Sequence, residues 1–357
     1  MHDIPNRTAA RCTRGVGFGR AGLDVVAGGA AMKAAVVSRY GRPDVVRIAD
    51  VPKPAVRDDG VLIRVHATTV NRTDCGYRAA KPFFIRLFSG LVRPRASILG
   101  TEFAGVVEEV GAKVHSVTIG DRVYGYVEGA FGAHAEYLSM PADGWVVPMP
   151  AGLTFEQAAP STEGAHYALS AIRRANIGSG DSVLVYGATG AIGSAAVQLL
   201  KSIGATVTAV CAGEHVKLVR DLGADRVIDY TVEDFTNDHD VYDAVFDAVG
   251  KCTFGQCRRM LKPRGVFLST DLGPLWQNPF LALITPPFRG RRVTFPAPLT
   301  DRETITYLGE LVGSGQFRPV IDRTYQLDDV VAAYRYVETG QKIGNVVLTV
   351  VNTGGTA

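Results

Sequence analysis

One stretch of the sequence, Asp181 to Cys211, constrains the fold more than any other. It opens with the apolar run Val183–Tyr186, which is typical of a strand buried on both faces of a parallel sheet. A glycine-rich turn follows over residues 187–193, and apolar residues then recur every three to four positions, as on one face of a helix. Thr206–Val210 has the composition of a second strand. A strand, turn, helix and strand within about 30 residues predict an α/β fold with a doubly wound parallel sheet.

The glycine-rich turn also indicates a site for a dinucleotide. Gly190 would let the backbone approach a pyrophosphate, and Gly193 would let the helix pack closely on the strand. The free N–H groups at the helix start, together with the positive end of the helix dipole, would face the phosphates. Where the usual pattern has its first glycine, this sequence has Ala188. The residues that we expect to contact the cofactor here are Ala188, Thr189, Gly190, Ala191, Ile192 and Gly193.

The pattern of strands and helices predicts two domains. Strands alternate with helices over residues 153–299, which we assign to the domain with the doubly wound parallel sheet. Residues 32–152 are rich in short strands, Gly and Pro, which predicts a small β-barrel domain, and we expect residues 300–351 to return to it. Residues 1–31 lack apolar periodicity; we expect a disordered extension there, with a cleaved transit peptide as the alternative.

Composition excludes several classes of protein. The net charge of the 357 residues is only +3, and it is scattered, so a nucleic-acid partner is not expected. The five cysteines form no CxxC pair and no disulfide framework, which favours a reducing, cytoplasmic setting. No apolar run approaches the roughly 18 residues of a membrane span, so none is predicted.

Ligands of doubly wound sheets bind beside the carboxyl ends of the strands. Two segments with this placement, Phe246–Gly250 and Ser269–Gly273, should therefore border the cofactor. Within the first of them, Ala248 and Val249 are the residues that we expect to contact it.

Two less regular segments are candidates for contact with the substrate. Residues 79–98 form either a mobile flap over a pocket or a surface loop. Residues 272–288 are apolar and aromatic, and they line either the substrate pocket or a dimer interface; the first reading implies a hydrophobic substrate. His134 and His166 are possible acid/base groups, although a single histidine beside an apolar strand is more often structural.

Several motifs occur in a fixed order between Met32 and Val350, among them MKAAVVSRYGRPDVVRI, VLIRVHATTVNRTD, ILGTEFAGVVEEVG, VLVYGATGAIGSAAVQLLKSIGA and GNVVLTV. In these motifs the chain resembles the medium-chain dehydrogenase/reductase superfamily, and within it the zinc-free quinone oxidoreductase-like branch. The resemblance implies a GroES-like barrel domain, a Rossmann domain, a nicotinamide cofactor between them and a homodimer.

The resemblance also predicts that no metal is bound. Zinc-dependent relatives take ligands from positions that are Asn71 and Thr101 here, and from a third position near residues 160–163, where this sequence has no cysteine. Zinc prefers thiolate, imidazole or carboxylate ligands. Without a Lewis acid, we expect direct hydride transfer to a small hydrophobic quinone or α,β-unsaturated carbonyl. The alternatives are a zinc-free alcohol or aldehyde dehydrogenase-like enzyme and a non-catalytic NADPH-binding sensor.

Three residues are the predicted catalytic set. Asn71 and Asp74 match the VNxxD segment that lies near the nicotinamide in the family, although Asp74 could equally hold its loop by hydrogen bonds. In quinone reductases a tyrosine often follows this aspartate by two residues. Here Gly76 occupies that place and Tyr77 comes one residue later, so either Tyr77 or water supplies the proton.

The end of the second strand of the Rossmann domain determines the choice of cofactor. NAD-selective sites carry an acidic residue there, whereas this chain has Cys211–Gly213, which leaves room for a phosphate. By resemblance, Lys217 binds the 2′-phosphate and Tyr230 contacts the adenosine, so we predict NADPH; Glu214 could instead bind the ribose hydroxyl. Asn345 replaces a family lysine near the pyrophosphate.

Overall fold

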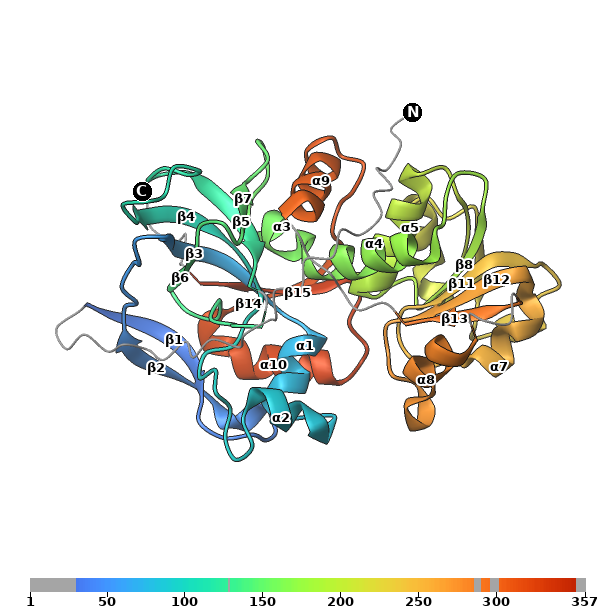
Figure 1. Cartoon of the computed structure of the whole chain (residues 1–357), viewed down its shortest axis with the longest axis horizontal. Coiled ribbons are helices and arrows are strands. Elements are labelled where there is room, and N and C mark those ends of the chain that lie inside the picture. The colour runs from blue at the N-terminus through green and yellow to red at the C-terminus, as the bar shows by residue number, and fades with distance from the viewer. Residues whose placement is uncertain (1–29, 128, 286–289, 296–301, 351–357) are drawn as a thin grey trace.

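Six strands form one parallel sheet, on the right of Figure 1, in the order β10-β9-β8-β11-β12-β13. The computed structural model describes residues 30–127, 129–285, 290–295 and 302–350. The chain order reverses between β8 and β11, which is where ligands bind in such sheets. The strands are β8 (Ser182–Tyr186), β9 (Thr206–Cys211), β10 (Arg226–Asp229), β11 (Tyr242–Asp247), β12 (Leu261–Ser269) and β13 (Arg292–Thr294).

Helices cover this sheet because its strands are apolar on both faces. The side chains of β8 from Val183 to Val185 are completely buried, and α4 and α5 pack against the sheet in one apolar core. The predicted doubly wound parallel sheet is therefore confirmed. The helices of this part are α4 (Glu163–Ala175), α5 (Ala191–Ser202), α6 (Val216–Asp221), α7 (Phe254–Cys257) and α8 (Gln277–Ile284).

A second sheet forms the barrel domain, on the left of Figure 1, in the order β14-β15-β3-β4-β5-β7, with β6 paired to β3. A separate antiparallel pair, β1 with β2, lies beside it. Strand β15 pairs antiparallel with β3, so the last strand of the described chain lies in this sheet. The strands are β1 (Ala31–Val37), β2 (Val46–Pro52), β3 (Gly60–Val70), β4 (Glu102–Val110), β5 (Arg122–Tyr126), β6 (Tyr137–Pro141), β7 (Trp145–Pro148), β14 (Ile321–Gln326) and β15 (Asn345–Thr349).

Two short helices lie where the sequence suggested irregular structure. Gln277–Ile284 is helical as α8, because Pro279 falls in the first turn, where a backbone N–H has no intrahelical partner, and the buried Asn278 anchors the helix start. Residues 79–98 include α2 (Arg86–Ser89). The other helices of the barrel domain are α1 (Arg72–Ala79), α3 (Phe155–Ala158) and α10 (Val330–Glu338).

Helix α9 (Arg302–Gly313) packs on both domains. Leu308 and Leu311 join the core of the Rossmann domain, while Ile305 joins an apolar cluster of the barrel. The predicted boundaries at residues 32–152, 153–299 and 300–351 remain predictions. Strand β1 begins at Ala31, and the rest of the expected extension lies outside the described residues, apart from Ala30. In the described part of the chain, no helix is long and apolar enough to cross a membrane.

Candidate active site

The glycine turn lies at the carboxyl end of β8, beside the point where the sheet order reverses. A Cβ on Gly193 would come within 2.1 Å of the Gly187 carbonyl oxygen, so the close packing of α5 requires glycine there. Gly190 is different, because a Cβ at that position would meet its nearest protein atom only at 3.6 Å, an ordinary contact. Protein packing therefore does not demand glycine at residue 190, and the open space beside it fits the close approach of a pyrophosphate.

The start of α5 is suited to an anion. Gly190 is the N-cap residue, and it offers no side chain to the first N–H groups of the helix, which have no intrahelical acceptor. These groups belong to Ala191 and Ile192, both predicted contacts. The N-terminal end of a 12-residue helix also carries a positive partial charge. Together with the open space at Gly190, this geometry fits the phosphates of a dinucleotide.

The barrel domain reaches the same turn through the segment that precedes β15. Gly344 donates its backbone N–H to the carbonyl oxygen of Thr189 at 2.7 Å and forms a parallel bridge with Gly190. Next to it, Asn345 donates its side-chain amide to the carbonyl oxygen of Val320 at 3.0 Å. Asn345 therefore lies beside the turn, but its amide is engaged within the barrel domain, and its contact with the cofactor remains a prediction.

The predicted contacts Ala248 and Val249 lie in a loop that is shaped by Asp247, a residue that the sequence did not single out. Its completely buried carboxylate accepts backbone N–H groups from Val249 at 3.1 Å and Gly250 at 2.8 Å. Burial raises the pKa of Asp247, while these hydrogen bonds oppose the rise. The loop brings Val249 against Gly187 in the glycine turn, so the two predicted contact regions meet.

The predicted adenosine-binding residues lie at the carboxyl ends of β9 and β10. Tyr230 donates its backbone N–H to the carbonyl oxygen of Cys211 at 3.1 Å, and its side chain is exposed. The side chain of Lys217 is 87% exposed and forms an ion pair with Asp221 at 2.6 Å. Such an exposed pair contributes little stability, so an incoming phosphate can recruit the lysine. The competing carboxylate, Glu214, is exposed as well.

A polar cluster at the domain boundary joins two predicted positions to a residue that the sequence analysis missed. Asn71 donates its side-chain amide to the hydroxyl of Thr101 at 2.7 Å and to the carboxylate of Glu163. The Thr101 hydroxyl donates to the same carboxylate oxygen at 2.7 Å, and Thr73 donates to the other oxygen at 2.6 Å. Glu163 falls in the range 160–163, where the third zinc ligand was expected to be a cysteine; its carboxylate is the sequence signal for this position.

Glu102 connects the two domains next to Glu163 of this cluster. One oxygen of its buried carboxylate accepts the backbone N–H of Glu163 at 2.6 Å and both the N–H and the hydroxyl of Thr162, while the other accepts the hydroxyl of Thr69 at 2.6 Å. Glu102 therefore serves as an N-terminal cap for α4, supplied from the barrel domain. This contact places Glu163 beside Asn71 and Thr101.

The buried charges in the cluster perturb one another. Burial, followed by the neighbouring charge of Glu102, raises the pKa of Glu163 to about 7. Burial lowers the pKa of Lys342 to about 8, although the charge of Glu163 opposes this. Lys342 also donates to the carbonyl oxygen of Gly344, next to the glycine turn. The protonation state of the cluster therefore changes within the neutral pH range.

Asp74 and Tyr77, the other predicted catalytic residues, are both engaged by the protein. The fully buried carboxylate of Asp74 accepts the backbone N–H of Asn71 at 3.1 Å and that of Gly100 at 3.0 Å, which completes a capping box for α1. Burial, followed by the charge of Glu163, holds the pKa of Asp74 well above its usual range. These contacts support the loop-holding interpretation for Asp74, whose catalytic role remains a prediction.

Tyr77 is directed toward the segment that was expected to be a flap or a surface loop. Its hydroxyl accepts the backbone N–H of Ala96 at 3.0 Å and donates to the carbonyl oxygen of Ser89 at 3.3 Å. Its ring packs against Phe131, with ring centroids 4.3 Å apart. Tyr77 thus anchors both ends of the 89–96 segment, and its role as a proton donor stays a prediction.

Both histidines have structural partners. His134 is completely buried, and its Nε2 lies 2.8 Å from the carbonyl oxygen of Thr69. His166 is buried among aromatic rings, and its Nδ1 lies 3.1 Å from the carbonyl oxygen of Thr162. Burial lowers the pKa of each imidazole to about 4, so both are neutral at physiological pH. These contacts favour the structural interpretation for both.

No group of three or more His, Cys, Asp or Glu side chains lies close enough to hold a metal ion within the described ranges of the chain. At the positions where zinc-dependent relatives carry ligands, Asn71, Thr101 and Glu163 are hydrogen-bonded to one another. One carboxylate with an amide and a hydroxyl is a poor ligand set for zinc.

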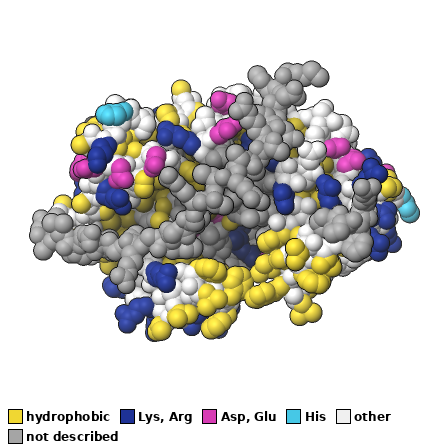
Figure 2. Space-filling model, viewed as in Figure 1, with side chains coloured by type: hydrophobic (Ala, Val, Ile, Leu, Met, Phe, Trp, Pro, Cys, Tyr) yellow, Lys and Arg dark blue, Asp and Glu magenta, His cyan; other side chains and the backbone are white. Residues whose placement is uncertain are grey.

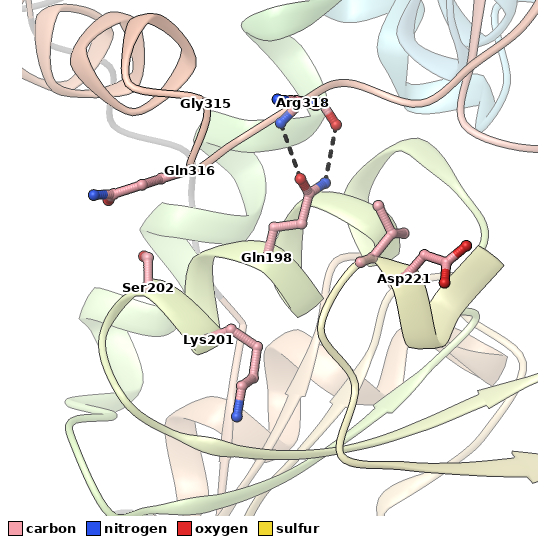
Figure 3. A pocket seen from close by; sticks show the side chains of 8 residues that line it. Gln198, Lys201, Ser202, Asp221, Gly315, Gln316 and Arg318 are labelled. Carbon is pink, nitrogen blue, oxygen red and sulfur yellow. Dashed lines mark hydrogen bonds between the residues drawn. The ribbon is translucent and has the colours of Figure 1, made fainter. Parts of the chain in front are cut away.

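A groove of about 430 Å³ lies at the other end of α5, and it contains none of the predicted site residues. Figure 3 shows that Gln198 faces the backbone of Arg318 across this groove. Its amide donates to the Arg318 carbonyl oxygen at 3.0 Å and accepts the Arg318 N–H at 2.9 Å. Hydrogen bonds in this groove therefore hold α5 against the segment after α9. The candidate active site lies instead between the glycine turn and the polar cluster of Asn71, Thr101 and Glu163.

Two family models match the chain. The model for the alcohol dehydrogenase GroES-like domain matches residues 57–151, and the model for a zinc-binding dehydrogenase matches residues 222–348. With the fold, the glycine turn and the relatives described next, these matches show that the chain belongs to the medium-chain dehydrogenase/reductase superfamily, in its quinone oxidoreductase-like branch. The predicted family is confirmed, and with it a nicotinamide cofactor.

Characterised relatives and solved structures resemble most of the chain. The 2-methylene-furan-3-one reductase of Solanum lycopersicum and the chloroplastic NADPH-dependent alkenal/one oxidoreductase of Arabidopsis thaliana are each 32% identical, over 89% of this chain and 79% of the relative. The mitochondrial NAD(P)H oxidoreductase RTN4IP1 of Mus musculus is 30% identical, over 90% of this chain and 89% of its own. The structure of the quinone oxidoreductase from Coxiella burnetii has a TM-score of 0.81 and 31% identity, covering 90% and 100% of the two chains.

Proposed function

We propose that the chain is an NADPH-dependent reductase that transfers a hydride to a quinone or an α,β-unsaturated carbonyl compound without a metal. The relatives named as alkenal/one, methylene-furanone and quinone reductases support this substrate class. The observation that carries the proposal is the hydrogen-bonded cluster of Asn71, Thr101 and Glu163 at the domain boundary. An amide and a hydroxyl are weak zinc ligands, so this cluster suits an acceptor that is already electrophilic.

The bound reduced nicotinamide would supply the hydride, and a proton must then reach the enolate or the quinol anion. We assign this proton to Glu163. In its protonated form, Glu163 can donate to the Thr73 hydroxyl, which lies 2.6 Å away and is partly exposed, while its other oxygen accepts from Asn71 and Thr101. The pKa of about 7 suits an acid that loses and regains a proton near neutral pH.

The proposed preference for NADPH over NADH rests on the end of β9. Cys211 and the two residues after it carry no acidic side chain, and Lys217 is exposed nearby. A charge-assisted hydrogen bond between the lysine and a 2′-phosphate contributes roughly 1.5–3 kcal/mol, which corresponds to about a tenfold to hundredfold gain in affinity. Glu214 would oppose this preference if it bound the ribose hydroxyl.

Two further features belong to the proposal. The expected homodimer is checked by light scattering of the purified chain. A cytoplasmic location is supported by cysteines without a disulfide framework, whereas two of the relatives carry the words chloroplastic and mitochondrial in their names. Fractionation of the native cell separates these locations.

The first experiment measures oxidation of NADPH, with NADH in parallel, against a panel of quinones and 2-enones in the presence of a chelator. Chelator-resistant turnover that favours NADPH would support the proposal, and the better acceptor would identify the substrate class. Loss of activity with the chelator would contradict the metal-free mechanism. Reduction of the oxidised cofactor by alcohols would favour a dehydrogenase, and tight NADPH binding without turnover would favour the sensor.

The assignment of the proton to Glu163 has its own test. With Glu163→Gln, kcat/KM for the better acceptor should fall at neutral pH, and the decrease of the unchanged enzyme above pH about 7 should disappear. Gln keeps the shape of the cluster, so cofactor affinity should stay the same. An unaltered pH profile in the variant would show that water or Tyr77 supplies the proton.

A further inference from the structure

Two segments far apart in the sequence expose large apolar side chains along one edge of the molecule. The first comprises η2 (Phe83–Ile85), α2 and the residues that follow, and the second comprises η7 (Pro274–Trp276) and α8. Figure 2 shows hydrophobic side chains gathered along the lower edge, beneath the positions of α2 and α8 in Figure 1. We call this surface the apolar edge; its exposed members are Phe83, Leu87, Phe88, Leu91, Val92, Leu275, Trp276, Phe280, Leu283 and Ile284.

The apolar edge is continuous across the two domains. The ring of Phe84 meets the ring of Trp276 edge to face, with centroids 4.9 Å apart, so the barrel segment and the Rossmann segment touch. On the barrel side, the hydrogen bonds of Tyr77 to Ser89 and Ala96 hold the segment against α1. The edge is therefore a defined surface of the folded chain that borders the boundary between the domains.

The backbone directs apolar side chains outward at some cost. Leu275 and Trp276 both adopt left-handed conformations, with φ of 51° and 61°, which residues other than glycine rarely adopt. Asn278, which is completely buried, fixes the turn through its amide, which donates to the Asp271 carbonyl oxygen at 2.9 Å. Leu275 is fully exposed, so its side chain gains no burial from this arrangement. Strained backbone that presents a contiguous apolar surface is typical of a binding site.

Within the two segments of the apolar edge, the charges have one sign. Residues 81–95 contain Lys81, Arg86, Arg93 and Arg95 and no acidic residue, and residues 272–285 contain no charged residue at all. Of the four basic side chains, all but Arg86 are exposed. A partner for this surface must therefore be apolar and must carry negative charge at its rim.

These features distinguish a lipid surface from a second copy of the chain. A two-fold contact would place the edge against itself, so that the cations of residues 81–95 would meet no acidic side chain from either segment. An anionic bilayer instead accepts aromatic and aliphatic side chains at the level of its headgroups and attracts Lys and Arg to its phosphates. We propose that the apolar edge docks the protein on membranes that contain anionic phospholipids.

Docking at this place would bring the boundary between the domains to the lipid surface, where hydrophobic quinones and long-chain enones dissolve. This use of the edge rests on the proposed reductase function, whereas the docking itself does not. The inferred substrate class is therefore a lipophilic acceptor that is taken from the bilayer rather than a small water-soluble one.

The test is sedimentation of the full-length chain with vesicles of phosphatidylcholine alone or mixed with phosphatidylserine. Leu275→Asn combined with Leu283→Gln removes apolar contacts, and Asn tolerates the left-handed backbone. Arg93→Gln removes one charge. The matched controls, Val232→Gln and Lys113→Gln, change an exposed apolar and an exposed basic side chain elsewhere. NADPH binding by each variant verifies that it is folded.

We expect binding to the mixed vesicles that weakens as salt is added. The double apolar variant should bind at least about tenfold less and Arg93→Gln about fivefold less, with both controls unchanged. Absence of binding to the mixed vesicles, or equal binding by all variants, would overturn the proposal. So would a dimer in lipid-free solution that the double variant converts to a monomer. Turnover of a water-soluble quinone is measured separately, so failure of the reductase proposal would be seen independently of vesicle binding.

Discussion

Replacement of Glu163 by glutamine should make the protein more stable at neutral and alkaline pH. The glutamine carbonyl can accept from Asn71 and Thr101 as the carboxylate does, and its amide can donate to the Thr73 hydroxyl. The variant therefore reproduces the neutral form of Glu163 without leaving a buried polar group unpaired.

The magnitude follows from the pKa of this carboxyl. Burial and Glu102 raise it from 4.5 to about 7 in the folded chain. Because the folded state holds the proton more tightly than the unfolded state, the stability contributed by the protonated group is present below pH 4.5 and is lost as the pH rises to about 7. The loss amounts to roughly 3 kcal/mol, at 1.36 kcal/mol for each pKa unit.

The assay is urea unfolding of both proteins at a series of pH values, followed by the fluorescence of Trp145, which is buried in the barrel domain beside Tyr126. The free energy of unfolding of Glu163→Gln minus that of the unchanged chain should rise by about 3 kcal/mol from low to neutral pH. Replacement of the exposed Glu233 by glutamine is the control and should give a flat difference, within about 0.5 kcal/mol. A flat difference for Glu163→Gln would refute the idea that this carboxyl is buried beside Glu102, and a difference that falls with pH would mean that its interaction with Lys342 dominates.

Four further substitutions test the architecture of the site. Gly190→Ala should leave the unfolding midpoint nearly unchanged and weaken NADPH binding at least about tenfold. Gly193→Ala should lower the unfolding midpoint itself, because its Cβ would lie 2.1 Å from a backbone oxygen. Equal effects of the two variants on the midpoint would contradict the assignment of Gly190 to phosphate contact and of Gly193 to packing. Lys217→Ala should raise the KM for NADPH about tenfold or more and leave the KM for NADH unchanged. Lys113→Ala is the control. A parallel rise in the KM for both cofactors would argue against a contact between Lys217 and the 2′-phosphate. Glu102→Ala should cost about 2–4 kcal/mol in urea unfolding, because the first N–H groups of α4 lose their acceptor, and a smaller loss would show that water replaces it.

The features that the sequence predicted best are those that are encoded locally. A continuous apolar strand, a glycine turn and a helix with apolar periodicity occur within one stretch, and the structure places them as β8, residues 187–190 and α5. We expected the end of the chain to return to the barrel domain, and in the structure β15 pairs with β3. Helix α8 was not predicted, because the short apolar segment in which it lies is interrupted by Pro274 and Pro279 and has no clear period.

The cluster that would supply the proton could not be read from the sequence. Asn71 and Glu163 are 92 positions apart, and they meet because Glu102 caps α4 from the other domain. No local pattern encodes such a pairing, and the pKa of a carboxyl depends on its burial and on neighbouring charges. The one signal for Glu163 in the sequence is that it is a carboxylate, a zinc-binding type of side chain, within residues 160–163.

The sequence by itself determined the strand, glycine turn and helix from β8 to α5, and the absence of thiol and imidazole side chains at two of the positions where zinc-dependent relatives carry ligands. Each of these depends on residue types at fixed spacing along the chain. The tertiary structure alone decided which polar side chains share the domain boundary, how far their pKa values move, and that Phe84 and Trp276 join two apolar segments into one surface. These properties arise from contacts between residues distant in sequence, so they exist only once the chain is folded.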